Sequence, residues 1–276
     1  MELCYIDGRF LPLNDAKLPV TDLIIQRGVG VFEVIATHNG RPLLLTPHLE
    51  RLAKSAESSR IVSGPSFDGM KRVIREGVSR ASDNGTAIRV KAYLSGGDTF
   101  DEVKGFTNPR FFVIFEEQTL PPKEAYENGV VLEPLPYGRD DPSVKSVDYR
   151  SSYALSQSGA FEVLYCPDGE ITETGHSSFF LVINGKIVTA PLPLVLKGTT
   201  RQVILELARG EGIEIEERCP LWSELPSADE AFITGSAKKV VPVSRIGGIV
   251  IGSGRPGKIT KKLSELYLRR IEEWLE

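Results

Sequence analysis

A single lysine in the middle of the chain is the first residue whose setting suggests covalent chemistry. Lys145 is the only lysine between Lys123 and Lys186. Its neighbours Val144 and Val147 are apolar, which is unusual for a lysine on a solvated face. Apolar surroundings disfavour the charged ammonium, and a neutral amine can bond covalently to an aldehyde. A surface or ion-paired lysine is the alternative that this residue alone leaves open.

Two small, hydroxyl-bearing turns are candidate anion sites. Gly198-Thr199-Thr200 comes directly before a predicted helix, whose first N–H groups and dipole favour a phosphate group. Thr234-Gly235-Ser236-Ala237 follows a predicted strand and offers a second turn of the same kind. Arg51, early in another predicted helix, can add a bidentate cation. Plain helix capping for the turns and a surface position for Arg51 remain the simpler alternatives.

Two further patterns resemble known sites but lack their context. Gly252–Gly257 matches G-x-G-x-x-G, yet a dinucleotide site needs a following strand with an acidic residue about 20 positions on. The sequence after Gly257 predicts only a helix, so we expect a turn there. Glu173 and His176 lie in a strand-like stretch, where a spacing of three places side chains on opposite faces. We therefore expect no metal site at this pair.

The composition of the chain argues against nucleic-acid binding, membrane insertion and metal binding. The chain has 276 residues with 33 Lys and Arg against 37 Asp and Glu, a net charge of −4 that gives no general attraction to nucleic acid. Apolar runs are far shorter than the roughly 20 residues of a membrane span. Neither the 3 cysteines nor the 3 histidines form a metal-binding pattern. Because the first residues show no signal peptide, we expect a cytoplasmic protein with no metal, nucleic-acid or membrane partner.

The predicted elements of the first half mix strands with two helices. Asp7-Gly8 predicts a hairpin between Leu3–Ile6 and Arg9–Leu13. A second hairpin is predicted between Val31–Thr37 and Leu43–Leu45. Thr46 is the predicted N-cap of the helix that follows, because Pro47 suits a first helical position. The remaining predictions here are a helix over Phe67–Ala81, strands over Ala87–Leu94 and Phe111–Phe115, and a long polar loop over Ser95–Pro109.

Two consecutive prolines suggest where the chain divides. Pro121-Pro122 lies in an aperiodic stretch, so we predict a small domain over residues 1–116, a linker over 117–122 and a larger domain over 123–276. The predicted strands of the larger domain are Val130–Glu133, Glu162–Cys166, Ser178–Ile183 and Lys186–Ala190. Its predicted helices cover Tyr149–Ala160, a segment that begins after Thr200 and runs through Val203–Ala208, and Ile259–Trp274.

The order of these motifs resembles one enzyme family, the class IV (fold-type-IV) pyridoxal-phosphate-dependent aminotransferases. The resemblance covers nearly the whole chain. The segments that carry it are Gly30–Val34, Pro47–Leu52, Pro142–Tyr149, Ile171–Thr174, Leu196–Arg201 and Phe232–Val243. It implies an α/β (α+β) fold of two domains, a small α/β N-terminal domain and a larger pseudo-barrel C-terminal domain. It also implies a homodimer.

The resemblance assigns roles to six residues. It implies that Lys145 bonds to the cofactor pyridoxal 5′-phosphate and moves the proton between the substrate Cα and the cofactor. Glu173 matches the carboxylate that pairs with the pyridine nitrogen and keeps it protonated. The residues that match the phosphate site are Arg51, Thr199, Thr200 and Ser236.

Where the family pattern is absent, other cations are candidates for the substrate carboxylate. D-amino acid transaminases carry an Arg-x-His pair in the long loop, which here begins Ser95-Gly96-Gly97-Asp98 and has no such pair. Ser178 stands in place of a common Asn, and Ile25 in place of a common Tyr. We expect Arg27 to bind the carboxylate. The further candidates are Arg89 and Lys91 on one strand face, Lys238, and the amide of Ala237.

Within the family the D-amino acid branch fits best. Branched-chain enzymes show Phe-Glu-Gly-Ile-Arg where this chain has Phe32-Glu33-Val34-Ile35-Ala36. We therefore predict transamination between a D-amino acid and a 2-oxo acid such as 2-oxoglutarate or pyruvate. The alternatives within the family are a branched-chain L-amino acid aminotransferase and aminodeoxychorismate lyase. A non-catalytic phosphate or metabolite binder and a hydrolase using Glu173 and His176 are the alternatives outside it.

Overall fold

A computed structural model describes residues 2–61, 64–82, 86–103, 105–149 and 159–276. The chain forms two compact units, each assembled from segments that are not contiguous in sequence. Unit 1 comprises residues 1–119, 144–148 and 272–276. Unit 2 comprises residues 120–143 and 149–271. The domain bounds predicted from the sequence stay a prediction.

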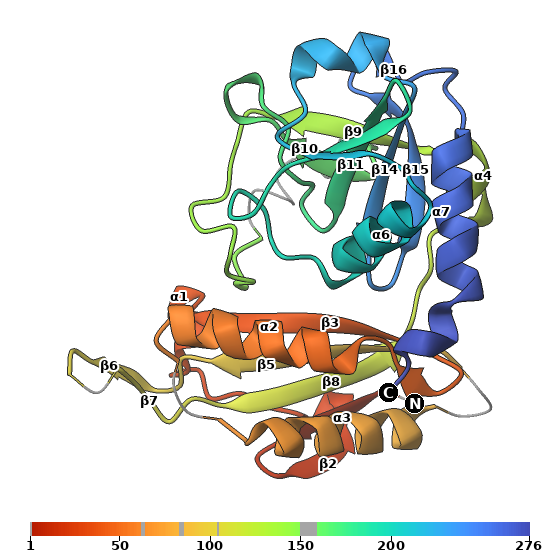
Figure 1. The fold of residues 1–276 in the computed structure, drawn as a ribbon. Coiled ribbons are helices and arrows are strands. Elements are labelled where there is room, and N and C mark those ends of the chain that lie inside the picture. Colours follow the sequence, from red (N-terminus) through yellow and green to blue (C-terminus); the bar gives the residue numbers. More distant parts are fainter. Residues whose placement is uncertain (1, 62–63, 83–85, 104, 150–158) are drawn as a thin grey trace. The chain divides into compact units, whose positions relative to one another are not determined.

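Unit 1 is built on a six-stranded sheet with the order β2-β1-β8-β5-β3-β4 (Figure 1). All the pairings within it are antiparallel. The strands are β1 (Leu3–Ile6), β2 (Arg9–Pro12), β3 (Gly30–His38), β4 (Arg41–Pro42), β5 (Ile88–Ser95) and β8 (Phe111–Glu117). The long loop after β5 contains a small hairpin of β6 (Thr99–Asp101) and β7 (Gly105–Thr107).

Two amphipathic helices cover one face of this sheet. They are α2 (Leu45–Ser58) and α3 (Phe67–Ala81), and their apolar sides pack on alternate residues of β3, β5 and β8. At Gly77 of α3 a Cβ atom would lie 2.0 Å from the Phe115 ring, so only glycine allows this close packing. The opposite face is covered in part by residues 11–24, which include a 3-10 turn over Leu13–Asp15 and lead into the short helix α1 (Leu23–Arg27).

Unit 2 is built on a curled, mixed sheet of eight strands with β10-β9-β15-β14-β11-β12-β13 in order and β16 paired to β15. The strands are β9 (Val130–Leu135), β10 (Glu162–Tyr165), β11 (Ser178–Ile183), β12 (Lys186–Thr189), β13 (Ile215–Glu217), β14 (Glu230–Gly235), β15 (Lys239–Ile246) and β16 (Ile249–Val250). Its apolar core lies between the central strands and residues of the 3-10 turn Trp222–Ser227.

Three helices accompany this sheet: α4 (Lys123–Asn128), α6 (Thr199–Gly210) and α7 (Lys258–Arg269). Short 3-10 turns cover Pro167–Gly169 and Ile271–Trp274. The glycine-rich run before α7 is a turn, as the sequence predicts. The Glu230 carboxylate accepts hydrogen bonds from the Ile259 and Thr260 N–H groups at 2.9 and 2.8 Å, so a protein carboxylate already caps this helix.

Several predicted elements are confirmed and others are wrong. The first hairpin, the helix Phe67–Ala81 and the strand Ser178–Ile183 agree with the structure. Thr46 is not a helix N-cap, because α2 begins at Leu45, two residues earlier than predicted, and its N-cap is Leu44. The strand predicted at Leu43–Leu45 is instead the short β4, since the chain turns at Asn39-Gly40. The predicted helix over Tyr149–Ala160 falls largely on residues 150–158, outside the described residues.

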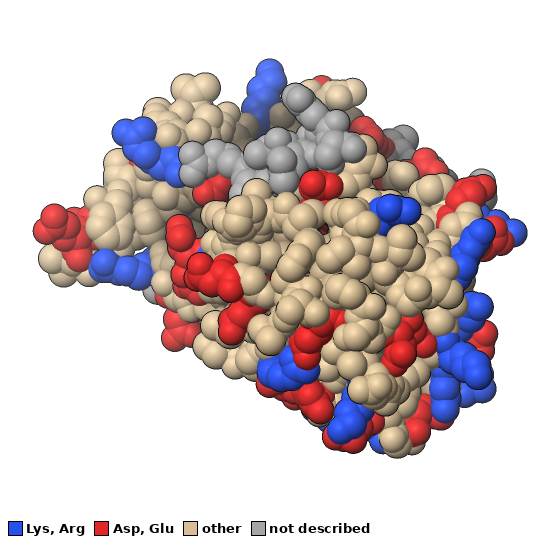
Figure 2. Space-filling model, turned by 90° about the horizontal axis from the view of Figure 1, so that it is seen from above, with Lys and Arg blue, Asp and Glu red and all other residues tan. Residues whose placement is uncertain are grey.

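No helix among the described residues is long and apolar enough to cross a membrane. On the face that Figure 2 shows, acidic and basic side chains are interspersed rather than gathered by sign.

Candidate active site

Glu173 is a buried carboxylate held at the end of a tight turn in unit 2. Its side chain is 4 % exposed, and its backbone carbonyl accepts a hydrogen bond from Tyr165 N at 2.9 Å. The turn that follows closes through a hydrogen bond from Thr174 N to Ser177 O at 2.9 Å. The carboxylate oxygen Oε2 accepts the Leu196 N–H at 3.3 Å. Backbone on both sides therefore fixes where this charge lies.

Arg139 is the cation beside Glu173. Its Nε lies 3.4 Å from Glu173 Oε1, and its Nη2 donates to the Gly175 carbonyl at 3.4 Å. Burial disfavours the guanidinium charge, but the Glu173 carboxylate and the Tyr149 side chain more than offset this and raise the pKa of Arg139. A charged arginine therefore lies beside Glu173, the carboxylate that matches the family's partner of the cofactor's pyridine nitrogen.

A short backbone segment connects Glu173 to the first turn of α6. Leu196 contacts the carboxylate, Gly198 N donates to Leu196 O at 2.7 Å, and α6 begins at Thr199. Gly198 is the N-cap and provides no side-chain cap for the first N–H groups. A Cβ atom there would lie 2.6 Å from Ser178 Oγ, so the backbone passes too close to β11 for any larger residue.

The first turn of α6 fits a phosphate group. Thr199 and Thr200 are both buried. The Thr200 hydroxyl interacts with the buried Tyr267 hydroxyl of α7, and this interaction opposes the rise that burial causes in the pKa of Tyr267. A helix N-terminus without a side-chain cap, carrying two buried threonines, is an environment that suits a phosphate monoester.

The turn after β14 lies at the same end of the sheet as this helix N-terminus. Thr234 pairs with Ser178 across β14 and β11, and Ser178 is the residue that Gly198 approaches. Ser236, Ala237 and Lys238 follow Thr234 within the turn and are partly buried. The structure thus brings Ser236 and the α6 N-terminus to one sheet end, as the phosphate assignment requires.

Lys238 is ion-paired with a buried carboxylate. Its Nζ contacts Glu162 Oε1, and Glu162 also accepts hydrogen bonds from the Ser177 hydroxyl at 3.1 Å and the Thr174 hydroxyl. Tyr126 OH donates to the Lys238 carbonyl at 3.1 Å. Glu162 therefore joins the turn after Glu173 to the turn that carries Ser236.

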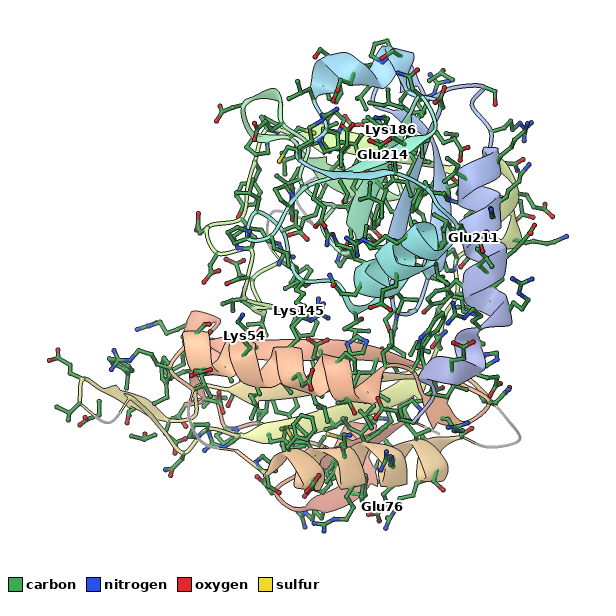
Figure 3. All side chains as sticks on the ribbon, in the orientation of Figure 1. Lys54, Glu76, Lys145, Lys186, Glu211 and Glu214 are labelled. Carbon is green, nitrogen blue, oxygen red and sulfur yellow. The ribbon has the colours of Figure 1, made fainter. Side chains whose placement is uncertain are left out.

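Lys145 is seated in unit 1, on the segment 144–148 that runs beside β3 (Figure 3). Its N–H donates to Ser55 Oγ of α2 at 3.1 Å, and its carbonyl accepts the Phe32 N–H at 3.0 Å. The residue is 8 % exposed, and its Nζ lies 4.7 Å from the centre of the Phe32 ring. The Lys145 side chain is therefore largely buried and lies over an aromatic ring.

Arg51 lies in a buried charge cluster of unit 1. Its Nε and Nη2 donate to the two oxygens of Glu33, both at 2.7 Å, and His48 Nδ1 lies 2.6 Å from Glu33 Oε2. Burial alone would raise the pKa of Glu33, but Arg51 and His48 hold it at about 2. Burial lowers the pKa of His48, opposed by Glu33. A bidentate partner fixes the direction of the Arg51 guanidinium.

The other candidate cations of unit 1 lie on two elements. Arg27 is exposed at the end of α1, where its Nη1 donates to Gln26 O at 3.1 Å. Arg89 and Lys91 share one face of β5, as the sequence predicts, and each contacts Glu116 at 2.6 Å. In the sheet Lys91 pairs with Val34 of β3, which places it on the Phe32 face.

His176 is exposed, and its ring stacks on that of Tyr149 at 5.0 Å. In the described part of the chain no group of three or more His, Cys, Asp or Glu residues could hold a metal ion.

Comparison with known proteins assigns the family. Residues 30–246 match the family model described as Amino-transferase class IV. The chain belongs to the class IV aminotransferases. A putative branched-chain-amino-acid aminotransferase from Methanocaldococcus jannaschii is 34 % identical over 98 % of this chain and 96 % of that protein. A D-alanine aminotransferase from Bacillus licheniformis is 30 % identical over 93 % of each.

A solved structure of the same family has the same fold. The T.th. branched-chain amino acid aminotransferase with pyridoxamine 5′-phosphate superposes with a TM-score of 0.88 at 26 % identity, over 99 % of this chain and 97 % of that one. The expected fold class, mixed α/β in two domains, is confirmed. Class IV aminotransferases use pyridoxal 5′-phosphate, so this chain is a pyridoxal-phosphate-dependent transaminase.

Three parts of the site were not found from the sequence. Arg139 beside Glu173, Glu162 beside Lys238, and Ser55 beneath Lys145 are joined to their partners by contacts between distant segments. Glu33 and His48 lie within segments that carry the resemblance, but their pairing with Arg51 has no local sequence signal. The i, i+3 spacing of His48 and Arg51 on a helix is the one clue that they share a face.

Proposed function

We propose that this aminotransferase transfers the amino group of a D-amino acid to a 2-oxo acid such as 2-oxoglutarate or pyruvate. The observation that carries this proposal is the surface of β3 beside Lys145. Phe32 and Val34 point to one face, the Lys145 amine lies over Phe32, and Lys91 stands opposite Val34. A surface with an aromatic ring at Phe32 and an ammonium group at Lys91 suits an amino or oxo acid that carries a second carboxylate.

The proposed roles of the residues follow from their settings. When bound, the cofactor supplies an electron-accepting ring conjugated to the substrate nitrogen. Glu173 would hold a proton on the ring nitrogen, and the Arg139 guanidinium lies 3.4 Å from that carboxylate. Thr199, Thr200 and Ser236 would bind the phosphate group, with Arg51 as the proposed cation from unit 1.

Lys145 is the proposed covalent and proton-transferring residue. Its amine is nearly buried, and Ser55 and Phe32 fix its backbone on both sides. A nearly buried amine would hold the cofactor aldehyde covalently until the substrate amino group takes its place, and the freed amine would then take a proton from the substrate Cα and return it on the cofactor side. Transamination needs both of these steps from one group.

The substrate carboxylate is the remaining charge to be bound. We propose Arg27 for this role, since its guanidinium is exposed at the end of a short helix. Arg89 and Lys91 share Glu116, so two cations face one anion there. Lys238 and the amide of Ala237 are further proposed donors, although Glu162 already binds the Lys238 ammonium.

A branched-chain L-amino acid aminotransferase is the second candidate. Two observations favour it: the 34 % identical relative carries that description, and so does the solved structure with pyridoxamine 5′-phosphate. Against it, β3 has Val34-Ile35-Ala36 where branched-chain enzymes show Gly-Ile-Arg.

The stereochemical test is to mix the holoenzyme separately with D-alanine, D-glutamate and L-leucine. The proposal predicts that the D-amino acids remove the visible absorption of the bound cofactor and release their 2-oxo acids, with D-glutamate more effective than D-alanine. Release of oxo acid from L-leucine alone would overturn the D-specific proposal and favour the second candidate.

The role of Lys145 has a separate test. Borohydride should fix the cofactor to the chain, and peptide mass spectrometry should find it on the peptide that contains Lys145. Lys145→Ala should bind the cofactor only reversibly and lose transaminase activity. Fixation on another lysine would contradict this assignment. A matched control is Lys54→Ala, an exposed lysine on α2.

A homodimer and a cytoplasmic location, as expected from the sequence, belong to the same proposal. Light scattering of the purified holoenzyme should give twice the 30.4 kDa mass of one chain.

A further inference from the structure

The long loop after β5 and the short helix α1 are fastened to each other within unit 1. Backbone hydrogen bonds join them at both ends of the helix. Leu23 N donates to Gly97 O at 2.8 Å, and Gly96 N donates to Val29 O at 3.0 Å. Because α1 has only five residues, these tertiary bonds rather than its own helix propensity must hold it in place.

A buried aspartate stands at the centre of this junction. Asp22 is 0 % exposed and is the N-cap of α1, where it accepts the Ile24 N–H at 2.9 Å. Its second oxygen accepts the Ser95 hydroxyl at 2.9 Å and Arg110 Nη1 at 2.7 Å. One carboxylate therefore contacts the helix, the start of the loop and the residue just beyond the loop.

Arg110 connects this aspartate to the loop itself. Its Nη2 contacts Asp98 at 2.5 Å, and Asp98 also accepts Asn108 Nδ2 at 3.1 Å. The hydrogen bond from Arg110 lowers the pKa of Asp98, with Asn108 adding to the effect. The planar guanidinium thus bridges two carboxylates, which a lysine ammonium cannot do with the same geometry.

The backbone of the loop leaves little room for adjustment. Gly97 has φ +73°, and a Cβ atom there would lie 2.1 Å from the Thr107 carbonyl. At Gly96 a Cβ atom would lie 2.7 Å from Val29 Cγ1. Gly96 lets the loop pass directly against Val29, two residues beyond Arg27, and Gly97 lets the two sides of the loop come together.

We infer that the Asp22–Arg110–Asp98 bridge is a positioning device for Arg27, so the loop acts on substrate selection through α1 instead of supplying its own ligands. The inference rests on the proposed role of Arg27 in binding the substrate carboxylate. It explains why a loop that lacks a cationic pair is nevertheless tied so closely to the helix that carries a cation. Asp22, Arg110 and Asp98 are positioning residues, since none of them is proposed to touch the substrate.

The test compares Arg110→Met with Arg27→Met in steady-state kinetics of the holoenzyme with its best amino donor. Arg110→Met should raise KM for the donor about tenfold and leave kcat within about twofold. The reason is that the variant weakens binding of the substrate and of the transition state by the same amount. The double variant should be no worse than Arg27→Met alone, since the bridge acts through Arg27. Additive losses in the double variant would overturn the inference.

A second measurement reports on α1 without using activity. Hydrogen exchange followed by mass spectrometry should show faster exchange of the peptide containing residues 22–29 in Arg110→Met, with an intermediate rate in Arg110→Lys. Faster exchange with an unchanged KM would also overturn the inference. If Arg110→Met fails to fold, Arg110→Lys and Asp98→Asn should shift KM in the same direction by less, and unchanged KM in both would contradict the proposal.

The two proposals fail in different ways. If Arg27→Met leaves KM unchanged, the role of Arg27 in the proposed function is wrong, and the positioning inference falls with it. If Arg27→Met raises KM and Arg110→Met does not, only the positioning inference is wrong. Arg209→Met, which removes an exposed ion pair with Glu217 in unit 2, is the matched control and should change neither KM nor exchange in residues 22–29.

Discussion

Two buried glutamates, one in each unit, are held in contrasting ways. Glu33 in unit 1 has contacts of 2.6–2.7 Å with His48 and Arg51, and its pKa is lowered to about 2. Glu173 in unit 2 is also buried and also faces an arginine, but its contacts to Arg139 and Leu196 N are 3.4 and 3.3 Å. The contacts of Glu33 with His48 and Arg51 are therefore shorter than those of Glu173 with Arg139 and Leu196 N.

The difference separates a carboxylate that organises the protein from one suited to a bound group. Short, bidentate pairing at Glu33 gives strong interactions that a ligand would have to break. The contacts of Glu173 with Arg139 and with Leu196 N locate the carboxylate, and their length leaves a new hydrogen bond to a pyridine nitrogen energetically competitive. We therefore expect substitutions at Glu33 to act on stability and substitutions at Glu173 to act on catalysis.

The largest expected effect is on turnover in Glu173→Gln. The amide keeps the size of the side chain but cannot hold a proton on the ring nitrogen, so kcat should fall about a thousandfold. Loss of the carboxylate charge beside Arg139 should lower the unfolding free energy by about 2 kcal/mol, less than the loss expected at Glu33. Steady-state kinetics and urea denaturation measure the two quantities. Glu206→Gln, at an exposed position on α6, is the control. A kcat within tenfold of wild type would contradict the catalytic role of Glu173.

Glu33→Gln should show the opposite pattern. The amide removes the buried negative charge that pairs with Arg51 and His48, so the free energy of unfolding should fall by about 3 kcal/mol. Urea denaturation of the apoenzyme is the measurement, with Glu50→Gln on the exposed side of α2 as the control. If this variant is as stable as the control, Glu33 does not stabilise the fold in the way proposed.

Arg139→Met tests whether Arg139 stabilises the buried Glu173 carboxylate in unit 2. Loss of the guanidinium removes a positive charge beside the buried Glu173 carboxylate, which should destabilise the apoenzyme by about 2 kcal/mol. A bound, protonated cofactor ring would restore that charge. The rise in Tm on adding pyridoxal 5′-phosphate should therefore be larger in Arg139→Met than in wild type. An equal or smaller rise would show that Arg139 does not compensate Glu173.

The smallest effect is the acid sensitivity of the Glu33 cluster. Burial lowers the pKa of His48 below 6.5, so the unfolded chain binds more protons and stability falls as the pH drops below about 6.5. The Glu33 contribution is complete above its unfolded pKa of about 4.5 and is lost as the pH falls toward about 2. Between about pH 7 and pH 5 the unfolding free energy should fall by about 1 kcal/mol. A rise over that range would contradict the buried neutral His48.

Much of the fold could be predicted from the sequence where local signals decide it. Asp7-Gly8 sets the first hairpin, and Ser66 caps the helix Phe67–Ala81 through Gly69 N. The start of α2 could not be predicted, because Glu276 accepts the Thr46 N–H at 2.8 Å and so takes the place of a local cap. The helix predicted to run to Trp274 ends at Arg269 instead, and a 3-10 turn follows.

The candidate site divides in the same way. Lys145, Glu173 and the hydroxyls near Gly198 were recognisable because each lies in a contiguous motif of the family. Arg139 was not recognisable from the sequence, because its partner Glu173 lies 34 positions away and no neighbouring residue indicates a buried cation. Ion pairs across distant segments, such as Lys238 with Glu162, depend on the tertiary structure and leave no periodic signal.

The chain's division into interleaved segments has a consequence for dissecting this enzyme. Lys145 is flanked on both sides by segments of unit 2, yet its backbone pairs with β3 and with Ser55 in unit 1. A fragment limited to residues 120–271 would contain the lysine without the strand that orients it. A fragment limited to residues 1–119 would have the strand without the lysine. Neither half expressed separately should trap an aldehyde at that amine, and mixing the two should restore trapping only if the fragments reassociate.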